Sequence, residues 1–335
     1  MSQEVSFGVV GLGMGMNRAN QVASTEGAKL VAVADLDESR CQAAVEKFGC
    51  ESHLDANEMF ERDDIDATFI MLPSGLHAKF GIEAANHGKH VITTKPMDVS
   101  LENCDALVNA CAHNNVKLLV DFQERYGTKN RRIQHAVQSG LIGDVIHCEL
   151  RMKWYRADSY YVGWHGTWEY DGGGSIMNQG VHYVDLMLWF MGDVERVIGA
   201  HYGIYTHENC ETEDLATAIL QFKSGAIGTG YTTTTFPKEA GSVSMINIHG
   251  DKGSVGLGPD IWAFTDGEPE FDLPNYPTNV VEDAIRVIRE GAIPAVDGRE
   301  GRRSVELNLA IYLSLIHISE PTRRYAISYA VFCLK

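Results

Sequence analysis

The fold of this chain is decided near its start, where residues 5–16 read VSFGVVGLGMGM. A short apolar run leads through a glycine-rich turn into a helical pattern. Gly11 permits a tight turn, Gly13 lets a pyrophosphate approach the backbone, and the helix N-terminus offers unpaired N–H groups to its negative charge. The third position of this glycine fingerprint holds Met16, with Gly15 one place early, so we expect slightly looser packing of the helix on the strand there. The stretch predicts a strand, turn and helix that bind a dinucleotide.

The same rhythm of short apolar runs and longer amphipathic stretches continues to about residue 122. Strands are predicted at 5–10, 30–34, 67–72, 90–93 and 117–120, and helices near 17–26, 38–48, 55–62, 76–87 and 101–114. This alternation is typical of βαβ units, and continuously apolar strands indicate a parallel sheet that is covered on both faces. We therefore expect an α/β fold whose residues 1–122 form a doubly wound Rossmann domain.

Asp35 ends the second predicted strand, where a carboxylate accepts hydrogen bonds from the adenosine ribose hydroxyls of a bound dinucleotide. The same charge repels a 2′-phosphate, so we expect NAD as the cofactor rather than NADP. A plain turn aspartate is the alternative, because Asp35-Leu36-Asp37 also resembles a helix start.

Residues 123–312 change character, since long strands of alternating polarity replace the βαβ rhythm. Strands are predicted at 145–155, 195–206, 214–222, 226–235 and 242–249, with helices near 128–139, 178–191, 279–290 and 301–312. Such alternation fits a sheet with two unlike faces. We expect an α+β domain with a large, mostly antiparallel open sheet, in which Ser224-Gly225 forms a hairpin turn. Residues 258–278 contain four prolines, so we predict a surface connection without regular structure there.

Two polar motifs follow predicted strands of the first domain, at the sheet edge where α/β folds bind ligands. Thr94-Lys95-Pro96 closes the fourth strand, so Lys95 is expected to project into the ligand crevice, with a solvated loop lysine as the alternative. Pro73-Ser74-Gly75-Leu76-His77 follows the third strand, where Ser74 and the backbone would line the nicotinamide and His77 is either a cofactor contact or an early-helix residue. The expected cofactor contacts are Gly11, Gly13, Met14, Gly15, Asp35, Pro73, Ser74, His77 and Lys95.

A polar helix face is predicted directly after the triple glycine at 172–174. On a continuous helix Asn178, His182 and Asp185 lie at i, i+4 and i+7, so they share one face of an otherwise apolar segment. A polar stripe of this kind favours a functional site. The alternative is a core histidine whose ring is satisfied by a neighbouring carboxylate.

Taken in order, these motifs give the chain a resemblance to the Gfo/Idh/MocA oxidoreductases over essentially all of residues 1–312. Further matching stretches are Glu213-Asp214 before a strand, residues 249–254 and residues 298–303. The resemblance implies reversible, NAD(P)-dependent oxidation of a secondary hydroxyl on a sugar, sugar derivative or cyclitol. In the family pattern Lys95 and His182 are the catalytic positions. His182 suits the base that removes the hydroxyl proton, and Lys95 would stabilise the charge that develops on the oxygen.

Two positions depart from the family pattern. Thr94 stands where family members usually carry Glu, so Lys95 lacks a neighbouring carboxylate in the sequence. Asn178 stands where many sugar and inositol dehydrogenases carry Asp, and an amide orients a substrate but cannot accept its proton. The second departure resembles the branch of the family that includes nucleotide-sugar dehydrogenases.

Aromatic and basic side chains crowd the stretch from 154 to 168, ahead of the triple glycine. Aromatic faces pack on sugar C–H surfaces, and Arg156 would bind hydroxyls, a phosphate or a carboxylate. The expected substrate contacts are Asn178, Asp185, Trp154, Arg156, Tyr161 and Trp164. An aromatic subunit interface is the alternative.

We therefore expect an NAD-dependent dehydrogenase or reductase that acts on a polyhydroxylated ring. A nucleotide-sugar (UDP-sugar) 3-dehydrogenase is the nearest alternative. A non-catalytic NAD(P)-binding sensor or repressor is the alternative from another class, and the presence of both Lys95 and His182 counts against it.

The charge, the cysteines and the apolar runs of the chain indicate which partners and which cellular location to expect. The net charge of −17 repels the phosphate backbone of nucleic acids, so small diffusible partners are expected. Seven scattered cysteines form neither a C-x-x-C pair nor a Cys/His cluster, so we expect no metal site and a reducing environment. The sequence has no secretion signal and no apolar run of membrane-spanning length, which favours the cytoplasm. Long strands whose second face the chain's own helices leave uncovered predict a homodimer or homotetramer.

Residues 313–335, LSLIHISEPTRRYAISYAVFCLK, resemble a translated sequencing adapter. We therefore expect this segment to be a non-native tail and leave it out of the fold prediction. A genuine helical tail is the alternative.

Overall fold

The computed structural model describes residues 4–314 and 332–333 of the chain. Packing divides the chain into two compact units, Met1–Tyr126 with Tyr276–Arg302, and Gly127–Asn275 with Arg303–Lys335. The expected tail at 313–335 lies almost entirely outside the described residues. Among the helices that the structure describes, none has the length and apolar character of a membrane span.

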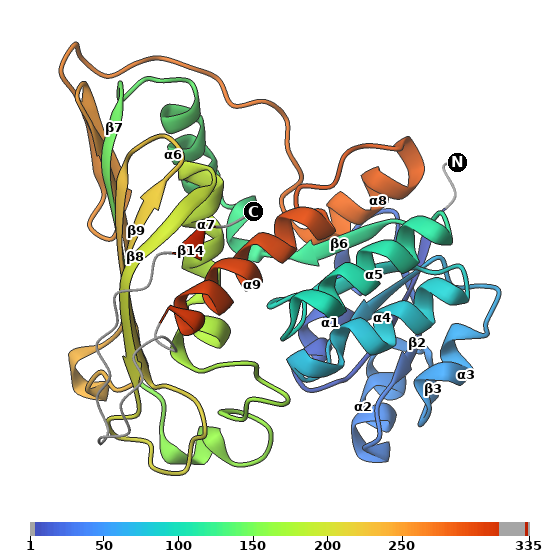
Figure 1. Cartoon of the computed structure of the whole chain (residues 1–335). Coiled ribbons are helices and arrows are strands. Elements are labelled where there is room, and N and C mark those ends of the chain that lie inside the picture. The colour runs from blue at the N-terminus through green and yellow to red at the C-terminus, as the bar shows by residue number, and fades with distance from the viewer. Residues whose placement is uncertain (1–3, 315–331, 334–335) are drawn as a thin grey trace. The chain divides into compact units, whose positions relative to one another are not determined.

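The first unit is built around a six-stranded parallel sheet with the strand order β3-β2-β1-β4-β5-β6 (Figure 1). Its strands are β1 (Val5–Val10), β2 (Ala28–Ala34), β3 (Glu51–His53), β4 (Ala67–Ile70), β5 (His90–Thr94) and β6 (Leu118–Asp121). Its helices are α1 (Gly15–Ser24), α2 (Glu38–Phe48), α3 (Ala56–Phe60), α4 (His77–Asn86), α5 (Leu101–His113) and α8 (Val280–Glu290), with 3-10 turns at Ser74–Leu76 and Gln123–Tyr126. This strand order reverses between β1 and β4 and confirms the predicted Rossmann fold.

Local signals in the sequence explain where these helices begin and end. Ser100 accepts a hydrogen bond from the Asn103 N–H and starts α5, the helix predicted near 101–114. The Asp37 side chain starts α2 in the same way, and Gly49 ends that helix in the left-handed conformation at φ 68°. The strands between the helices carry the apolar residues that form the core of the sheet.

Residues 276–302 pack with the first unit, although the sequence analysis grouped them with the second domain. Helix α8 buries Val280, Val281, Ala284 and Val287 in the core that also contains Phe7 and Phe69. Its apolar face is thus covered by the Rossmann sheet rather than by the second sheet. The last helix, α9 (Gly298–Leu313), crosses the boundary between the units at residue 302.

The second unit contains an eight-stranded sheet with the order β13-β12-β11-β7-β10-β9-β8-β14 within the described residues. Its strands are β7 (Val145–Lys153), β8 (Val194–Gly203), β9 (Leu215–Phe222), β10 (Ile227–Thr233), β11 (Val243–Gly250), β12 (Gly253–Leu257), β13 (Ile261–Phe264) and β14 (Phe332–Cys333). Neighbouring strands are antiparallel except for the parallel pair β7 and β10. Helices α6 (Thr128–Gln138) and α7 (Val181–Met191) lie against the same face of this sheet (Figure 1). The mostly antiparallel sheet predicted from the sequence is therefore confirmed.

The predicted hairpin turn is also confirmed. Phe222 and Ala226 bond across the turn, and Gly225 adopts φ 91°, a conformation that glycine reaches without strain. Residues of β9 alternate between a buried face and a more exposed face, because side chains point to opposite faces at successive positions.

The expectation of no regular structure at 258–278 is wrong for residues 261–264. Strand β13 has the sequence IWAF and pairs with β12. The four prolines of the segment flank this stretch without entering it, and β-branched and aromatic residues favour a strand. The short strands β3 and β12 were also absent from the prediction.

The helix predicted over 178–191 begins three residues late. Residues Ser175–Gln179 form a π-helical turn, and the α-helix α7 starts only at Val181. Asn178 therefore lies in the π turn, and the predicted continuous i, i+4, i+7 face does not exist in that form. His182 and Asp185 do lie on α7.

Candidate active site

The glycine turn after β1 has the conformation that its sequence predicts. Gly11 adopts φ 85°, and a Cβ there would lie 2.5 Å from the Met71 carbonyl oxygen. Gly15 opens α1 and is buried, and its Cβ position lies 3.1 Å from side-chain atoms of Val9 and Met71. Close packing of helix on strand is therefore provided by Gly15, so the looser packing expected from Met16 is not found.

The open side of this turn offers room and charge for a pyrophosphate. A Cβ at Gly13 would meet no atom nearer than Arg40 Nη1 at 3.9 Å, and Met14 is 71% exposed. No side chain caps the N-terminus of α1, so its first N–H groups remain available to an anion. These residues fit the phosphates of a dinucleotide.

Asp35 stands at the end of β2 with its carboxylate turned back to the glycine turn. Its Oδ2 accepts a hydrogen bond from the Leu12 N–H at 2.6 Å, and its Oδ1 accepts one from the Asp37 N–H at 2.9 Å. Arg40 Nη1 lies 3.7 Å from Oδ2. The position of the carboxylate fits an acceptor for ribose hydroxyls. The Arg40 guanidinium beside it was not expected from the sequence.

His77 links two loops of the first unit. Its Nε2 lies 2.7 Å from the Leu72 carbonyl oxygen and its Nδ1 lies 2.8 Å from the Pro96 carbonyl oxygen. Burial lowers the pKa of the ring. Both ring nitrogens lie at hydrogen-bond distance from backbone carbonyl oxygens, so the ring links these two loops, and the expected cofactor contact stays a prediction.

Lys95 follows β5 in a loop that is held from several sides. Three residues after Lys95, the fully buried Asp98 accepts hydrogen bonds from the Ala78 N–H, the Val99 N–H and the Asn103 side-chain amide. These bonds tie the loop to the starts of α4 and α5, and His77 ties it to Leu72. Ser74, which the sequence placed near the nicotinamide, is buried in the 3-10 turn before α4. Lys95 thus leaves the sheet from a rigid loop.

In the second unit, Glu213 braces the triple-glycine loop. It accepts hydrogen bonds from the Gly174 N–H at 2.8 Å, the Ile176 N–H at 3.0 Å and the Tyr312 hydroxyl at 2.9 Å. A Cβ on Gly174 would lie 1.7 Å from the Glu213 carbonyl oxygen, so only glycine fits there. Burial raises the pKa of the Glu213 carboxyl to about 7 despite these donors. Sequence reasoning quoted Glu213 only as a motif and missed this role.

The loop presents Asn178 to a histidine and an aspartate. Asn178 Nδ2 donates to Asp171 Oδ1 and lies 3.3 Å from His165 Nδ1, which itself lies 3.5 Å from Asp171 Oδ2. Asp171 is buried, whereas the His165 side chain is 23% exposed. The predicted pair on α7 follows directly, with His182 half-buried and Asp185 buried. Asp171 was missed, although its place just before the triple glycine could have marked it.

Most of the predicted aromatic residues gather around His165 at the surface of this unit. The ring centroids of Trp164 and Tyr160 lie 3.7 and 4.1 Å from that of His165. The Arg156 guanidinium lies over Tyr160 and Trp154, at 5.1 and 5.2 Å from their ring centroids. These five side chains, which we call the aromatic cluster, are Trp154, Arg156, Tyr160, Trp164 and His165, all partly exposed. Flat faces beside a guanidinium suit a sugar with a negatively charged substituent.

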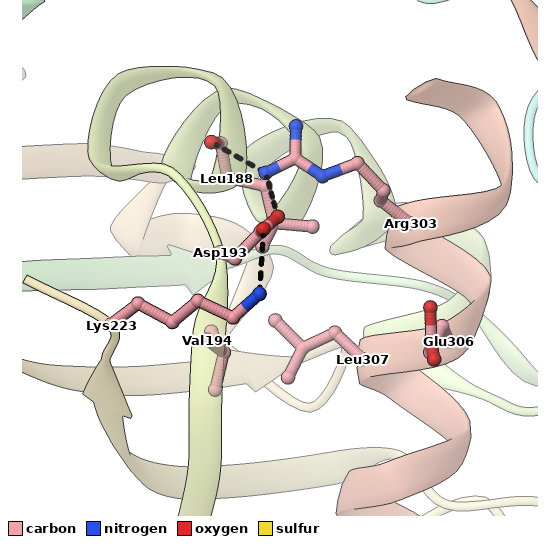
Figure 2. A pocket seen from close by; sticks show the side chains of 7 residues that line it. All are labelled: Leu188, Asp193, Val194, Lys223, Arg303, Glu306 and Leu307. Atoms are coloured by element: carbon pink, nitrogen blue, oxygen red, sulfur yellow. Dashed lines mark hydrogen bonds and ion pairs between the residues drawn. The ribbon is translucent and has the colours of Figure 1, made fainter. Parts of the chain in front are cut away.

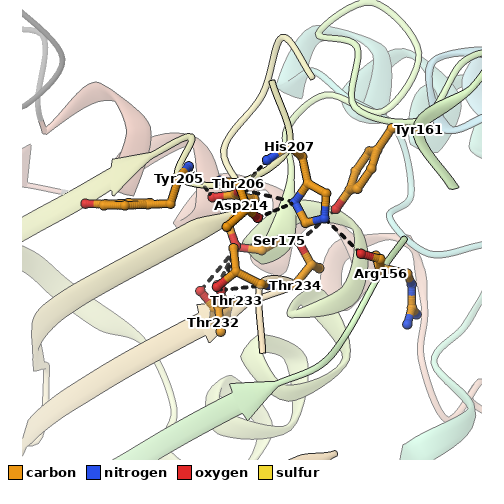
Figure 3. A network of polar contacts seen from close by, with 11 residues as sticks. Arg156, Tyr161, Ser175, Tyr205, Thr206, His207, Asp214, Thr232, Thr233 and Thr234 are labelled. Carbon is orange, nitrogen blue, oxygen red and sulfur yellow. Dashed lines mark hydrogen bonds and ion pairs between the residues drawn. The ribbon is translucent and has the colours of Figure 1, made fainter. Parts of the chain in front are cut away.

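Tyr161 does not belong to this exposed cluster. Its hydroxyl lies 2.7 Å from Thr234 Oγ1 and burial raises its pKa. Its ring packs 4.7 Å from that of His207, whose Nε2 contacts the Arg156 carbonyl oxygen at 2.8 Å and whose Nδ1 contacts Asp214 at 3.1 Å (Figure 3). These contacts fix the backbone of Arg156. Tyr161 therefore supports the aromatic cluster from the interior of the unit.

A separate cavity of about 180 Å³ in the second unit has no catalytic character (Figure 2). Asp193 lies 3.0 Å from both Arg303 Nη2 and Lys223 Nζ, so its carboxylate offsets their charges. The cavity is lined by Leu188, Asp193, Val194, Lys223, Arg303, Glu306 and Leu307. We assign it no role in the candidate site.

Family models match both parts of the chain. Residues 5–122 match the oxidoreductase family with an NAD-binding Rossmann fold, and residues 130–256 match the GFO/IDH/MocA C-terminal domain.

Solved and curated relatives agree with these models. The WlbA dehydrogenase from Bordetella pertussis, solved in complex with NADH and UDP-GlcNAcA, is 30% identical with a TM-score of 0.85, covering 94% of this chain and 96% of that chain. A myo-inositol 2-dehydrogenase from Thermotoga maritima is 26% identical, covering 92% of this chain and 96% of that protein. An uncharacterized oxidoreductase from Streptococcus pneumoniae is 27% identical, but the match spans only 55% of that protein.

The order of the motifs, the two folds and these matches confirm the resemblance found in the sequence. The chain belongs to the Gfo/Idh/MocA family of oxidoreductases, with an NAD-binding Rossmann domain in its N-terminal part.

Proposed function

We propose that this protein is an NAD-dependent dehydrogenase or reductase that interconverts a secondary hydroxyl and a keto group on a sugar, sugar derivative or inositol. The observation that carries the proposal is the uncapped, glycine-lined start of α1 beside Asp35, because it supplies acceptor, donors and space for a dinucleotide in one place. When bound, NAD would supply the acceptor for the hydride that leaves the carbinol carbon.

The chain's own residues handle the proton and the oxygen. His182 takes the hydroxyl proton during oxidation and returns it during reduction. Lys95, on its braced loop, stabilises the negative charge that develops on the substrate oxygen. Asn178 orients a substrate hydroxyl through its amide, which Asp171 holds, and Asp185 lies close by on α7.

A nucleotide sugar is the second candidate substrate. Arg156 in the aromatic cluster offers a cation to a phosphate or carboxylate. The WlbA dehydrogenase, bound to UDP-GlcNAcA in its structure, is 30% identical to this chain, compared with 26% for the inositol dehydrogenase from Thermotoga maritima. Trp154, Arg156 and Trp164 are the proposed contacts, with Tyr161 supporting them from the interior.

The proposal is tested by mixing the protein with NAD or NADP and a panel of inositols, aldoses, UDP-sugars and UDP-uronic acids, and following the absorbance of reduced cofactor. We expect turnover with NAD on one class of the panel, and its loss in Lys95→Met and His182→Asn variants that still bind NAD. Tight NAD binding without turnover on any substrate would instead support the sensor or repressor.

We also propose that the protein forms a homo-oligomer through the face of the second sheet that α6 and α7 leave uncovered. This face carries Ile219, which is 45% exposed, in register with Thr229, which in turn pairs with Glu149. A homodimer or homotetramer would cover it. The cytoplasmic location expected from the sequence remains a prediction.

A further inference from the structure

Strand β6 ends in a buried carboxylate that none of the roles above uses. Asp121 is 2% exposed, and its Oδ2 accepts a hydrogen bond from Arg18 Nε at 2.5 Å. Its Oδ1 is also buried but has no hydrogen-bond partner among the described residues. A buried carboxylate oxygen without a partner costs free energy, so packing alone does not explain an aspartate at this position.

The pairing of β5 with β6 places this carboxylate beside Thr94, the residue that directly precedes the proposed catalytic lysine. Thr94 and Asp121 are direct partners in the parallel ladder, so their side chains share one face of the sheet at its carboxyl edge. Lys95 is the next residue in the chain, in the loop that begins where β5 ends at Thr94. Thr94 brings no charge to this position, whereas Asp121 does.

The charges around Asp121 agree with such a partnership. Burial raises the pKa of its carboxyl, and the nearby cations Arg18 and Lys95 act in the opposite direction. Among the titratable groups nearby in this unit, Tyr126 feels the charge of Asp121, and His77 feels the charges of Lys95 and Asp98.

We propose that Asp121 is a positioning residue for Lys95: held by Arg18, its carboxylate keeps the lysine protonated and directed from the end of β5. The role rests on the proposed function of Lys95. An opposite charge favours the ammonium form, so removing the carboxylate lowers the pKa of Lys95 and makes the amine neutral at a lower pH.

The test follows the pH dependence with which Lys95 reacts with acetic anhydride, quantified by peptide mass spectrometry on the full chain without substrate. In Asp121→Asn we expect the midpoint of reactivity to fall by roughly one pH unit. Thr94→Glu in the same background restores a carboxylate at the paired position and should return the midpoint toward the wild-type value. Asp63→Asn, at an exposed position, is the matched control and should leave it unchanged.

An unchanged midpoint in folded Asp121→Asn protein overturns the proposal. If that variant does not fold, Thr94→Glu alone carries the test, because a second carboxylate beside Lys95 must raise the midpoint and no change overturns the idea.

Activity provides an independent arm. The alkaline limb of the kcat/KM profile should shift to lower pH in Asp121→Asn and recover in the double variant, and an unmoved limb in active protein contradicts the role. Failure of the proposed function appears differently, as no turnover in any variant while the reactivity shift persists.

Discussion

Asp35, at the end of β2, is the residue that we expect to decide between NAD and NADP. Its carboxylate would repel a 2′-phosphate, while Arg40 at 3.7 Å would attract one. Asp35→Asn keeps an acceptor for the Leu12 N–H but removes the charge. We expect the ratio of NAD affinity to NADP affinity to fall roughly tenfold in calorimetric titrations. The ratio should not change in Glu38→Gln, which removes an exposed charge nearby, and an equal change in both variants would remove Asp35 from this role.

In the second unit, Asp171 is the residue that holds both the proposed substrate contact Asn178 and the neighbouring His165. Asp171→Asn replaces a charged acceptor by an amide, and a hydrogen bond to a charged group contributes about 1.5–3 kcal/mol. We expect kcat/KM to fall roughly ten- to a hundredfold, with NAD affinity unchanged. Glu169→Gln, at an exposed neighbouring position, is the control. Wild-type kcat/KM in a folded Asp171→Asn protein would show that the Asn178 amide needs no anchor.

At the scale of elements, the stability that Glu213 gives to the triple-glycine loop depends on pH. Burial raises the pKa of this carboxyl from 4.5 in the unfolded chain to about 7 in the folded protein, so the folded state binds the proton more tightly. Its contribution is fully present below pH 4.5, declines as the pH rises toward 7, and changes little above that. The decline amounts to at most about 3 kcal/mol.

We therefore expect the melting temperature of the wild-type protein to fall between pH 5 and pH 8 more steeply than that of Glu213→Gln. The slope is the readout, because Gln places a donor against the Gly174 or Ile176 N–H and lowers the absolute stability at every pH. Parallel slopes for the two proteins would mean that Glu213 does not titrate in this range.

Elements with strong local signals were predictable from the sequence, and those that depend on tertiary contacts were not. The strands of the Rossmann sheet other than β3 contain apolar runs, and the helix predicted near 101–114 begins after its Ser100 cap. The π turn at Ser175–Gln179 was missed because it depends on backbone bonds to Glu213, far away in the sequence. Strand β13 was missed because the prolines of residues 258–278 indicate irregular structure, and its four residues are too short a run to predict a strand against that signal.

The same distinction applies to the candidate site at the scale of the whole molecule. Motifs that follow strands, such as the glycine turn and Lys95, are visible in the sequence because α/β sheets bind ligands at that edge. The roles of Glu213 and Asp121 are not, because each acts through a partner that only folding brings close. The Lys95 and His182 roles come from different units of the chain and stay predictions for the kinetic tests.

Assembly is the remaining prediction at this scale. Ile219→Arg adds a charge to the uncovered face of the second sheet, where 45% of the isoleucine is exposed in a single chain. We expect light scattering at micromolar concentration to show an oligomer for the wild-type protein and a monomer for the variant. Ile293→Arg changes an exposed isoleucine in the first unit and should leave the oligomer intact. A monomeric wild-type protein would rule out this interface.

Tyr312 lies directly before the adapter-like segment 313–335, so its contacts determine how far that segment can be shortened. The ring is fully enclosed, packs edge-on against Tyr202 and Trp168 at 5.1 and 5.4 Å, and its hydroxyl reaches Glu213. A cut placed even one residue too early would remove Tyr312, whose hydroxyl supports the triple-glycine loop that leads into the π turn with Asn178. Shortened expression clones should therefore keep this tyrosine, and loss of activity after a deeper deletion would reflect damage to the turn rather than any function of the removed residues.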